Sequence, residues 1–312
     1  MDAKRLNEIV EAVVRELTAA GLSSGPAPAQ TAVPAPAALP PAPAAAPSPA
    51  LSALVVDLED PTTPAARAHP GVQNPADADG LAALMEATPA RIGYGCAGAR
   101  YRTAPWLTFQ ADQAVTQDTL YRDVDENLLS SLGLFKVQTR VTGGKQEYLL
   151  RPDLGRQLNE EARQTIQQRC TRAPQVQVCV GDGLSAQAIE SNLAQILPVI
   201  RQGCQTAGLS FGTPFFIQYC RVGVMNDIGD LLQPLVLMLL IGERPGLGRA
   251  DSMSVYMGFR PQKGHTDAER DVICNVFNGG TNPLEAGAYA VQLAQKMIRF
   301  QAGGVKLKLA EG

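Results

Sequence analysis

The stretch PLVLMLLIGERPGLG, residues 234–248, decides the fold class. Apolar residues follow one another without a break from Leu235 to Ile241, and a glycine-rich loop with Glu243 and Arg244 comes directly after them. Strands that are covered on both faces have such unbroken apolar runs, whereas half-exposed strands alternate. The stretch therefore predicts a buried strand that ends in a glycine-rich loop.

Expected strands and helices alternate on both sides of this strand. We expect further strands at 176–180, 214–219 and 252–259, and helices at 186–207, 226–232 and 283–302. Such alternation is typical of right-handed β-α-β units. The predicted fold is α/β, with a Rossmann-like, mainly parallel sheet flanked by helices. A smaller, mostly helical region and a disordered Pro/Ala linker precede it.

The region before the alternating part is expected to be helical and irregular. We predict a helix at 104–121, a hairpin at 134–151 that turns at Thr142-Gly143-Gly144, and another helix that opens at 151–156. The globular unit then divides into an N-terminal helical part, residues 75–155, and a Rossmann-like domain, residues 156–312.

The N-terminus has a different composition. In residues 1–22, apolar residues recur at helical spacing, so an amphipathic helix is predicted. Residues 23–74 form a Pro/Ala-rich linker and approach segment, with no charged residue between Glu16 and Asp57. Such a helix either docks into a groove on another protein or folds back onto its own domain.

Composition excludes several classes of protein. The 312 residues include 45% apolar ones and have a formal net charge of −3, and no run of Lys and Arg indicates nucleic-acid binding. No apolar run approaches the roughly 20 residues of a membrane helix. Six scattered cysteines without a CxxC pair, and no secretory signal, indicate free thiols in a reducing cytosol.

Histidine is too scarce for many catalytic sites. His69 and His265 are the only two, which excludes a three-histidine metal site, and both are expected on the solvated surface. No G-x-S-x-G elbow occurs, and Cys179 lies inside an expected strand. We therefore predict a ligand-binding scaffold with no metal site and no catalytic residue of its own.

Two loops at expected strand ends are candidates for ligand binding, because open α/β sheets bind ligands there. GDGLSA, residues 181–186, matches the dinucleotide fingerprint, but the acid inside it would repel a pyrophosphate. Asp182 and Ser185 either cap the following helix or contact a ligand. In the loop at 242–248, Glu243 either accepts hydrogen bonds from ligand amides or pairs with Arg244.

Several longer segments follow one another in the order found in a known protein family. RPDLGR (151–156), VQVCVGDGLSAQAI (176–189), GTPFFIQYCRV (212–222), IGERPGLGRADSMSVY (241–256) and NGGTNPLEAGAYAVQLAQKM (278–297) together resemble the small (light) subunit of ethanolamine ammonia-lyase. The resemblance runs from about residue 75 to 303, and the N-terminal helix with its linker is also similar to that family.

The resemblance implies a lyase that uses adenosylcobalamin to convert ethanolamine to acetaldehyde and ammonia by a radical route. The large subunit, a TIM barrel, would bind ethanolamine and most of the corrin ring, and this chain would complete the cofactor site and be active only with it. It also implies a location in the bacterial cytoplasm within a microcompartment, with residues 1–22 as a candidate encapsulation signal for its shell or cargo.

The resemblance also assigns cofactor contacts. Val222, Glu243 and Val272 stand at the family's contact positions, and Cys274 lies two residues beyond the third. Neither histidine lies in a D-x-H-x-x-G motif, which agrees with a base-on cofactor that keeps its own benzimidazole and takes no histidine ligand from this chain.

Two other functions stay open from the sequence. One is a non-catalytic scaffold that recruits the large subunit to a microcompartment. The other is a stand-alone nucleotide-binding enzyme that uses GDGLSA.

Overall fold

A computed structural model describes residues 63–88 and 90–311 of the chain. All of these lie in one of the two units into which the chain divides, residues 58–312. The predicted N-terminal helix at 1–22 and most of the predicted linker at 23–74 lie outside the described residues. Within the described part of the linker, Pro64–Ala68 forms the short helix α2.

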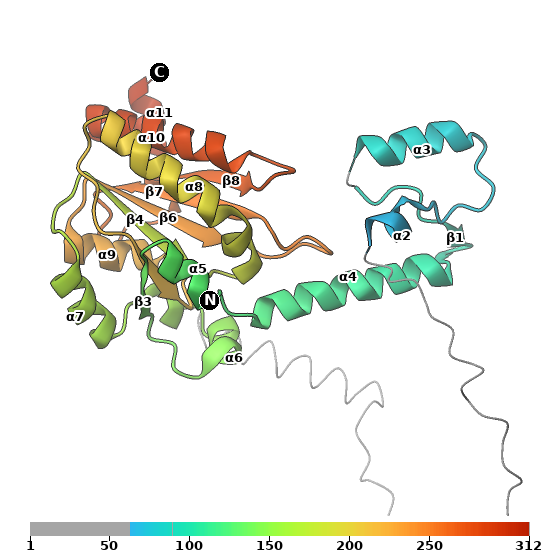
Figure 1. The fold of residues 1–312 in the computed structure, drawn as a ribbon, viewed down its shortest axis with the longest axis horizontal. Coiled ribbons are helices and arrows are strands. Elements are labelled where there is room, and N and C mark those ends of the chain that lie inside the picture. The colour runs from blue at the N-terminus through green and yellow to red at the C-terminus, as the bar shows by residue number, and fades with distance from the viewer. Residues whose placement is uncertain (1–62, 89, 312) are drawn as a thin grey trace, which may run out of the picture. The chain divides into compact units, whose positions relative to one another are not determined.

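The central element is a six-stranded sheet with strand order β3-β5-β4-β6-β7-β8 (Figure 1). The strands are β3 (Phe135–Gln138), β4 (Val176–Gly181), β5 (Phe215–Gln218), β6 (Val236–Gly242), β7 (Met253–Phe259) and β8 (Arg270–Val276). The helices against the sheet are α7 (Glu160–Arg169), α8 (Ala186–Thr206), α9 (Val224–Leu232) and α10 (Pro283–Phe300).

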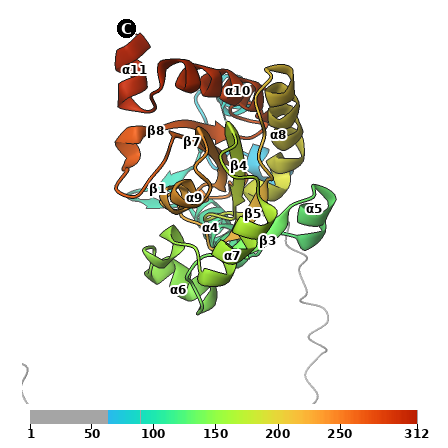
Figure 2. The same cartoon turned by 90° about the vertical axis from the view of Figure 1, so that its left-hand side faces the viewer.

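Helices cover both faces of the sheet (Figure 1 and Figure 2), and each face has its own hydrophobic core. Val236, Met238 and Leu240 of β6 pack in the core that includes α8 and α10. The intervening Leu237 and Leu239 pack in the core that includes α7 and α9. Burial on both faces explains the unbroken apolar run, and the predicted α/β fold with flanking helices is confirmed.

The prediction of a mainly parallel sheet needs a correction. β3, β5, β4 and β6 pair in parallel, but β7 is antiparallel to both β6 and β8, so the sheet is mixed. Only residues 243–252 separate β6 from β7, and they contain no helix. A parallel connection needs a crossover of a dozen or more residues, so a link this short returns the chain antiparallel.

The region before β4 is mostly helical. It contains α3 (Ala78–Ala87), α4 (Thr103–Tyr121), α5 (Glu126–Ser131) and α6 (Gly144–Leu150), with the two-residue strands β1 (Cys96–Ala97) and β2 (Arg100–Tyr101). Because β3 belongs to the main sheet, this region shares that sheet with later residues. The boundary at residue 155 stays a prediction.

Two local predictions in this region were inaccurate. The hairpin at 134–151 is wrong: its first half contains β3, and its second half lies mostly in the helix α6. The carboxylate of Glu147 accepts hydrogen bonds from the amides of Thr142 and Gly143, which starts a helix where a turn was expected. The helix expected to open at 151–156 is only the 3-10 turn η2 (Leu154–Arg156), and α7 follows four residues later.

Two short elements complete the fold. The 3-10 turn η3 (Asp267–Glu269) precedes β8, and the helix α11 (Val305–Glu311) follows α10. Among the helices of the described ranges, none combines the length and apolarity that crossing a membrane requires.

Candidate functional site

A cavity of about 400 Å³ opens at the edge of the sheet where β4, β5 and β6 end. We call it the strand-end cavity. The antiparallel strand β7 begins at this same edge, so its first residues join the lining, and the last part of β8 completes it. Its lining includes Tyr148, Arg221, Val222, Glu243, Tyr256 and Cys274. The predicted position of a binding site, outside the carboxyl ends of parallel strands, matches this cavity.

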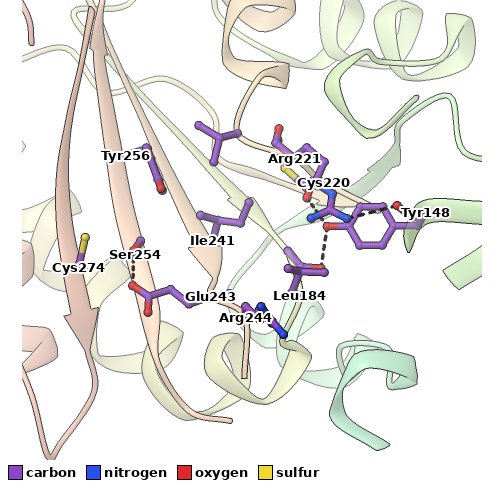
Figure 3. Close-up of a pocket in the computed structure, with 13 residues that line it drawn as sticks. Tyr148, Leu184, Cys220, Arg221, Ile241, Glu243, Arg244, Ser254, Tyr256 and Cys274 are labelled. Atoms are coloured by element: carbon purple, nitrogen blue, oxygen red, sulfur yellow. Dashed lines mark hydrogen bonds between the residues drawn. The ribbon is translucent and has the colours of Figure 1, made fainter. Parts of the chain in front are cut away.

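Glu243 joins three strands at the edge of this cavity (Figure 3). Its carboxylate accepts hydrogen bonds from the hydroxyls of Ser252, at 2.8 Å, and Ser254, and from the amide of Asn275 at 3.1 Å. Among the described residues, Arg244 makes no ion pair with Glu243. Glu243 therefore braces its loop through serines and an amide, and the pairing with Arg244, one of the two alternatives, does not occur among the described residues.

The loop that resembles a dinucleotide fingerprint is packed against the end of β6. Gly183 has a φ of 56°, and a Cβ at this position would lie 2.1 Å from the carbonyl oxygen of Gly242. The amide of Leu184 donates to that same oxygen at 3.1 Å. The close approach that glycine permits here is between this loop and the last residue of β6, so it serves packing within the chain.

Asp182 and Ser185 have different roles. Ser185 caps α8 by accepting a hydrogen bond from the amide of Ala188 at 3.1 Å. Asp182 is only 1% exposed and accepts hydrogen bonds from the amides of Tyr219 and Cys220 at 2.9 and 2.8 Å. It therefore fastens the turn after β5 to the end of β4, and of the two residues only Ser185 is the helix cap.

A buried cation balances the charge of Asp182. The Nζ of Lys145 lies 3.0 Å from its Oδ2, and the Lys145 side chain is only 10% exposed. Burial raises the pKa of Asp182, while Lys145 and the two backbone amides act in the opposite direction. The pair links α6 to the sheet, because Lys145 belongs to α6 and Asp182 directly follows β4.

Tyr148, on α6, is part of the lining of the strand-end cavity. Its single hydroxyl proton is shared between the carbonyl oxygens of Gly183 and Cys220, which lie at 2.9 and 2.7 Å. Burial, and then the negative charge of Asp182, raise the pKa of Tyr148 well above its usual value, so the hydroxyl stays protonated. The guanidinium carbon of Arg221 lies 4.2 Å from the centre of the Tyr148 ring (Figure 3).

The loop after Glu243 is also held by residues of the region before β3. The hydroxyl of Thr116 on α4 donates to the carbonyl oxygen of Gly246 at 2.9 Å, and Arg91 donates to that of Leu247. Arg91 and Arg67 both pair with Asp112, which is fully buried on α4. The position of the loop therefore depends on residues more than a hundred positions earlier.

The three predicted contact positions differ in where they lie relative to the strand-end cavity. Val222 and Glu243 both line the strand-end cavity. Val272 does not; it is 45% exposed and lies opposite Tyr256, which does line the cavity. Cys274, two residues further along β8, lines it directly. The structure thus brings Cys274 to Val222 and Glu243, with Val272 next to the rim.

Sequence reasoning missed Tyr148, Arg221, Tyr256 and Cys274. Arg221 and Cys274 lie within two residues of the expected contact positions Val222 and Val272. Their short distance in sequence from these positions could have identified them. Tyr148 carried no signal, because it comes from a helix that was predicted as a strand. Of the two histidines, His69 is exposed at the end of α2 and His265 is half-buried outside the strand-end cavity. Within residues 63–88 and 90–311, no cluster of three or more His, Cys, Asp or Glu side chains could hold a metal ion.

Comparison with known proteins gives one consistent result. Residues 78–308 match the family model described as Ethanolamine ammonia-lyase light chain (EutC). An ethanolamine ammonia-lyase small subunit from Clostridium perfringens is 44% identical over 237 residues, which cover 76% of this chain and 80% of that protein. Proteins of the same name from Listeria monocytogenes and Listeria innocua are 43% identical over the same shares.

Proposed function

The chain belongs to the ethanolamine ammonia-lyase light-chain family, and from this premise we propose that it completes the cofactor site of an adenosylcobalamin-dependent enzyme. The reaction is the conversion of ethanolamine to acetaldehyde and ammonia. The observation that carries the proposal is the strand-end cavity, in which Val222 and Glu243, two expected contact positions, lie together with Cys274.

The lining of the cavity suits the edge of a corrinoid, which has apolar surface and many amide groups. Val222 and Ile241 offer apolar contact. A carboxylate has about four acceptor positions, and three donors of this chain already use those of Glu243, so one remains for a ligand N–H. We therefore propose Val222, Glu243 and Cys274 as cofactor contacts, with Val272 as a contact at the rim.

A second chain is part of this proposal. A cavity of about 400 Å³ is near the lower limit for ligand pockets and holds only a portion of so large a cofactor. The large subunit supplies the rest of the cofactor site and most of the contacts to ethanolamine. When bound, adenosylcobalamin supplies the radical chemistry. The residues of this chain bind it, orient it and exclude water from one side, in a Rossmann-like manner at the ends of parallel strands.

We further propose that the cofactor keeps its own benzimidazole, since among the described residues neither histidine lines the strand-end cavity. Residues 1–22, outside the described ranges, are proposed to direct the complex into a bacterial microcompartment in the cytoplasm. Deletion of residues 1–50 is then expected to abolish encapsulation in cells while leaving acetaldehyde formation by the purified complex unchanged.

Reconstitution tests the main proposal. The chain is expressed with and without an ethanolamine ammonia-lyase large subunit, adenosylcobalamin is added, and acetaldehyde formation from ethanolamine is followed. We expect turnover only with both chains. Co-purification without turnover would favour the scaffold function, and the absence of any complex would refute the proposal.

A further inference from the structure

The turn between β5 and α9, residues 219–223, carries Val222, which lines the strand-end cavity. We call it the contact turn. It begins with a strained residue, because Tyr219 has a φ of 58°, in the left-handed region that bulky side chains rarely adopt. Such strain persists only where the surrounding structure imposes it, and it occurs preferentially at functional sites. The groups that hold Tyr219 therefore determine where Val222 lies.

A buried carboxylate holds this residue in place. The Oδ2 of Asp182 accepts a hydrogen bond from the amide of Tyr219 at 2.9 Å, and its Oδ1 accepts one from the amide of Cys220 at 2.8 Å. Hydrogen bonds to a charged acceptor are about twice as strong as those between neutral groups. Two successive peptide groups are thus fixed on one rigid carboxylate, directly ahead of Arg221 and Val222.

Neutral donors complete the attachment of the contact turn. The hydroxyl of Thr139 donates to the carbonyl oxygen of Tyr219 at 3.0 Å, and the hydroxyl of Tyr148 lies 2.7 Å from the carbonyl oxygen of Cys220. Asp182 is therefore the charged acceptor in the set of groups that hold the start of the turn.

Asp182 acts from outside the strand-end cavity. It is only 1% exposed and is not part of the lining. Its partner Lys145, with Nζ 3.0 Å from Oδ2, is not part of the lining either. A change in ligand binding that follows a substitution of Asp182 or Lys145 is thus transmitted through the residues that they hold.

Lys145 favours the charged form of Asp182. Burial raises the pKa of Asp182, and the positive charge of Lys145 opposes this shift. The Nζ of Lys145 also lies 5.5 and 5.8 Å from the ring centres of Tyr219 and Tyr148, and 3.6 Å from the carboxylate of Asp123. The ammonium group is therefore enclosed by two carboxylates and two aromatic rings.

The other titratable groups next to Asp182 are uncharged near neutral pH. Burial raises the pKa of both of these tyrosine hydroxyls and of the Cys220 thiol above their usual values. The guanidinium group of Arg221, which stacks on one of the two rings, stays charged at every pH that proteins tolerate. Asp182 is therefore the group of this cluster whose protonation responds to the removal of Lys145.

We propose that Asp182 is a positioning residue of the cofactor site: through the amides at the start of the contact turn, it sets the place at which Val222 meets the cofactor. This inference rests on the proposed function. It adds a residue that controls cofactor affinity without touching the cofactor, and a partner, Lys145, that supports it electrostatically.

The test measures the affinity of the complex with the large subunit for cyanocobalamin, by equilibrium dialysis. In Asp182→Asn, one carbonyl oxygen replaces two charged acceptors, and we expect the affinity to fall about tenfold or more. Ile200→Ala is the matched control, because Ile200 is fully buried in the second half of α8 and does not line the strand-end cavity. Both substitutions lower the urea midpoint of unfolding, but the affinity of Ile200→Ala should stay within about twofold of the natural complex.

Lys145→Met separates positioning from stability through its pH profile. The variant keeps the carboxylate and both amides but loses the cation that lowers the pKa of Asp182, so this pKa rises further. Relative to the natural complex at the same pH, the affinity should be nearly unchanged at about pH 9 and fall about fivefold or more toward about pH 6, because a protonated carboxyl loses an acceptor position. A purely structural role would lower the urea midpoint and leave this ratio independent of pH.

Hydrogen exchange of the complex without cofactor reports on the contact turn directly. In Asp182→Asn, exchange in a peptide that covers residues 219–223 should be about tenfold faster than in Ile200→Ala, because the amides of Tyr219 and Cys220 lose their charged acceptor. Equal exchange of this peptide in the two variants would contradict the role of Asp182.

The outcomes of the binding test separate the alternatives. An affinity loss in Asp182→Asn no larger than in Ile200→Ala, or a pH-independent ratio for Lys145→Met, would overturn the positioning role. If one of these two variants does not assemble, the other decides. If the natural complex binds no cyanocobalamin, the proposed function fails and this inference fails with it. Binding by the natural complex without a response in the variants overturns the inference and leaves the proposed function intact.

Discussion

The carboxylate of Glu243 accepts a hydrogen bond from the backbone amide of Asn275 at 3.1 Å, which joins the end of β6 to β8 across the intervening strand β7. Asn275 has a φ of 56°, in the left-handed region that asparagine tolerates better than most residues. This local break in β8 follows Cys274 directly. A single acid thus holds together the strands that contribute Ser254, Tyr256 and Cys274 to the strand-end cavity.

Replacing Glu243 with Gln separates its bracing function from its proposed contact with the cofactor. An amide has fewer acceptor positions than a carboxylate, so the free energy of unfolding is expected to fall by about 1–2 kcal/mol. Affinity for cyanocobalamin in the complex with the large subunit is expected to fall about threefold to tenfold. Urea unfolding and equilibrium dialysis measure the two effects.

Ser252→Ala is the control for this substitution. Ser252 donates to Glu243 at 2.8 Å but does not line the strand-end cavity. It should lower stability by about 1 kcal/mol without a change in cobalamin affinity. If Glu243→Gln behaves in the same way, Glu243 only braces its loop.

Gly183→Ala tests whether the loop after β4 depends on close packing. The new Cβ would lie 2.1 Å from the carbonyl oxygen of Gly242, in addition to the cost of a φ of 56°. We expect a loss of about 2–4 kcal/mol in the free energy of unfolding. Gly133→Ala is the matched control, because its φ is 70° and nothing lies within 4 Å of the new Cβ, so it should lose only about 1 kcal/mol. Equal losses would show that packing against Gly242 contributes nothing.

Cys274→Ala and Val272→Ala decide which position of β8 makes the proposed contact with the cofactor. Cys274 lines the strand-end cavity, and Val272 lies beside it. We expect cobalamin affinity to fall about twofold to fivefold in Cys274→Ala and less in Val272→Ala, since only the first change removes atoms from the lining. Equilibrium dialysis with the complex measures both, and a larger loss in Val272→Ala would contradict this ranking.

Glu147 gives a pH-dependent prediction. The amides of Gly143 and Thr142 donate to its carboxylate and hold the pKa of Glu147 below its usual value of 4.5. The fold thus favours the charged form, and this stabilisation is complete above the unfolded-state pKa and is lost as the pH falls through the folded-state pKa. The stability difference between the natural chain and Glu147→Gln should be constant from neutral pH down to about pH 5 and shrink below it.

Urea unfolding at a series of pH values measures this difference. Because glutamine also accepts hydrogen bonds from amides, the start of α6 is expected to keep its geometry, as far-ultraviolet circular dichroism would confirm. A difference that does not depend on pH would contradict the role of the Glu147 charge.

The parts of the fold that could be predicted are those whose signals are local. The apolar run of β6, the helix cap at Ser185 and the Asn282-Pro283 start of α10 each identify an element from its own residues. The direction of β7 needed a different signal, the short link between residues 242 and 253. The hairpin was predicted from Gly143 and Gly144, but Glu147 nearby turns the same segment into a helix.

The candidate site was predictable only in part, for a similar reason. Positions such as Val222 and Glu243 follow strands, so sequence order places them at one edge of the sheet. The partners of Glu243, and the approach of Gly183 to Gly242, arise from packing between distant segments and have no counterpart in the local pattern. The pair of Asp182 with Lys145 was hidden for the same reason, because α6 was not expected to be a helix.

The interruption of β8 at Asn275 also bears on how the sheet avoids pairing with other molecules. β8 is an edge strand, and a long flat edge invites strands of other molecules to pair with it and aggregate. The left-handed residue and the register shift opposite Met253 and Val255 interrupt the regular row of donors and acceptors. The opposite edge, β3, has only four residues. Both edges of the sheet therefore offer strands of other molecules only a short or interrupted row of backbone groups to pair with.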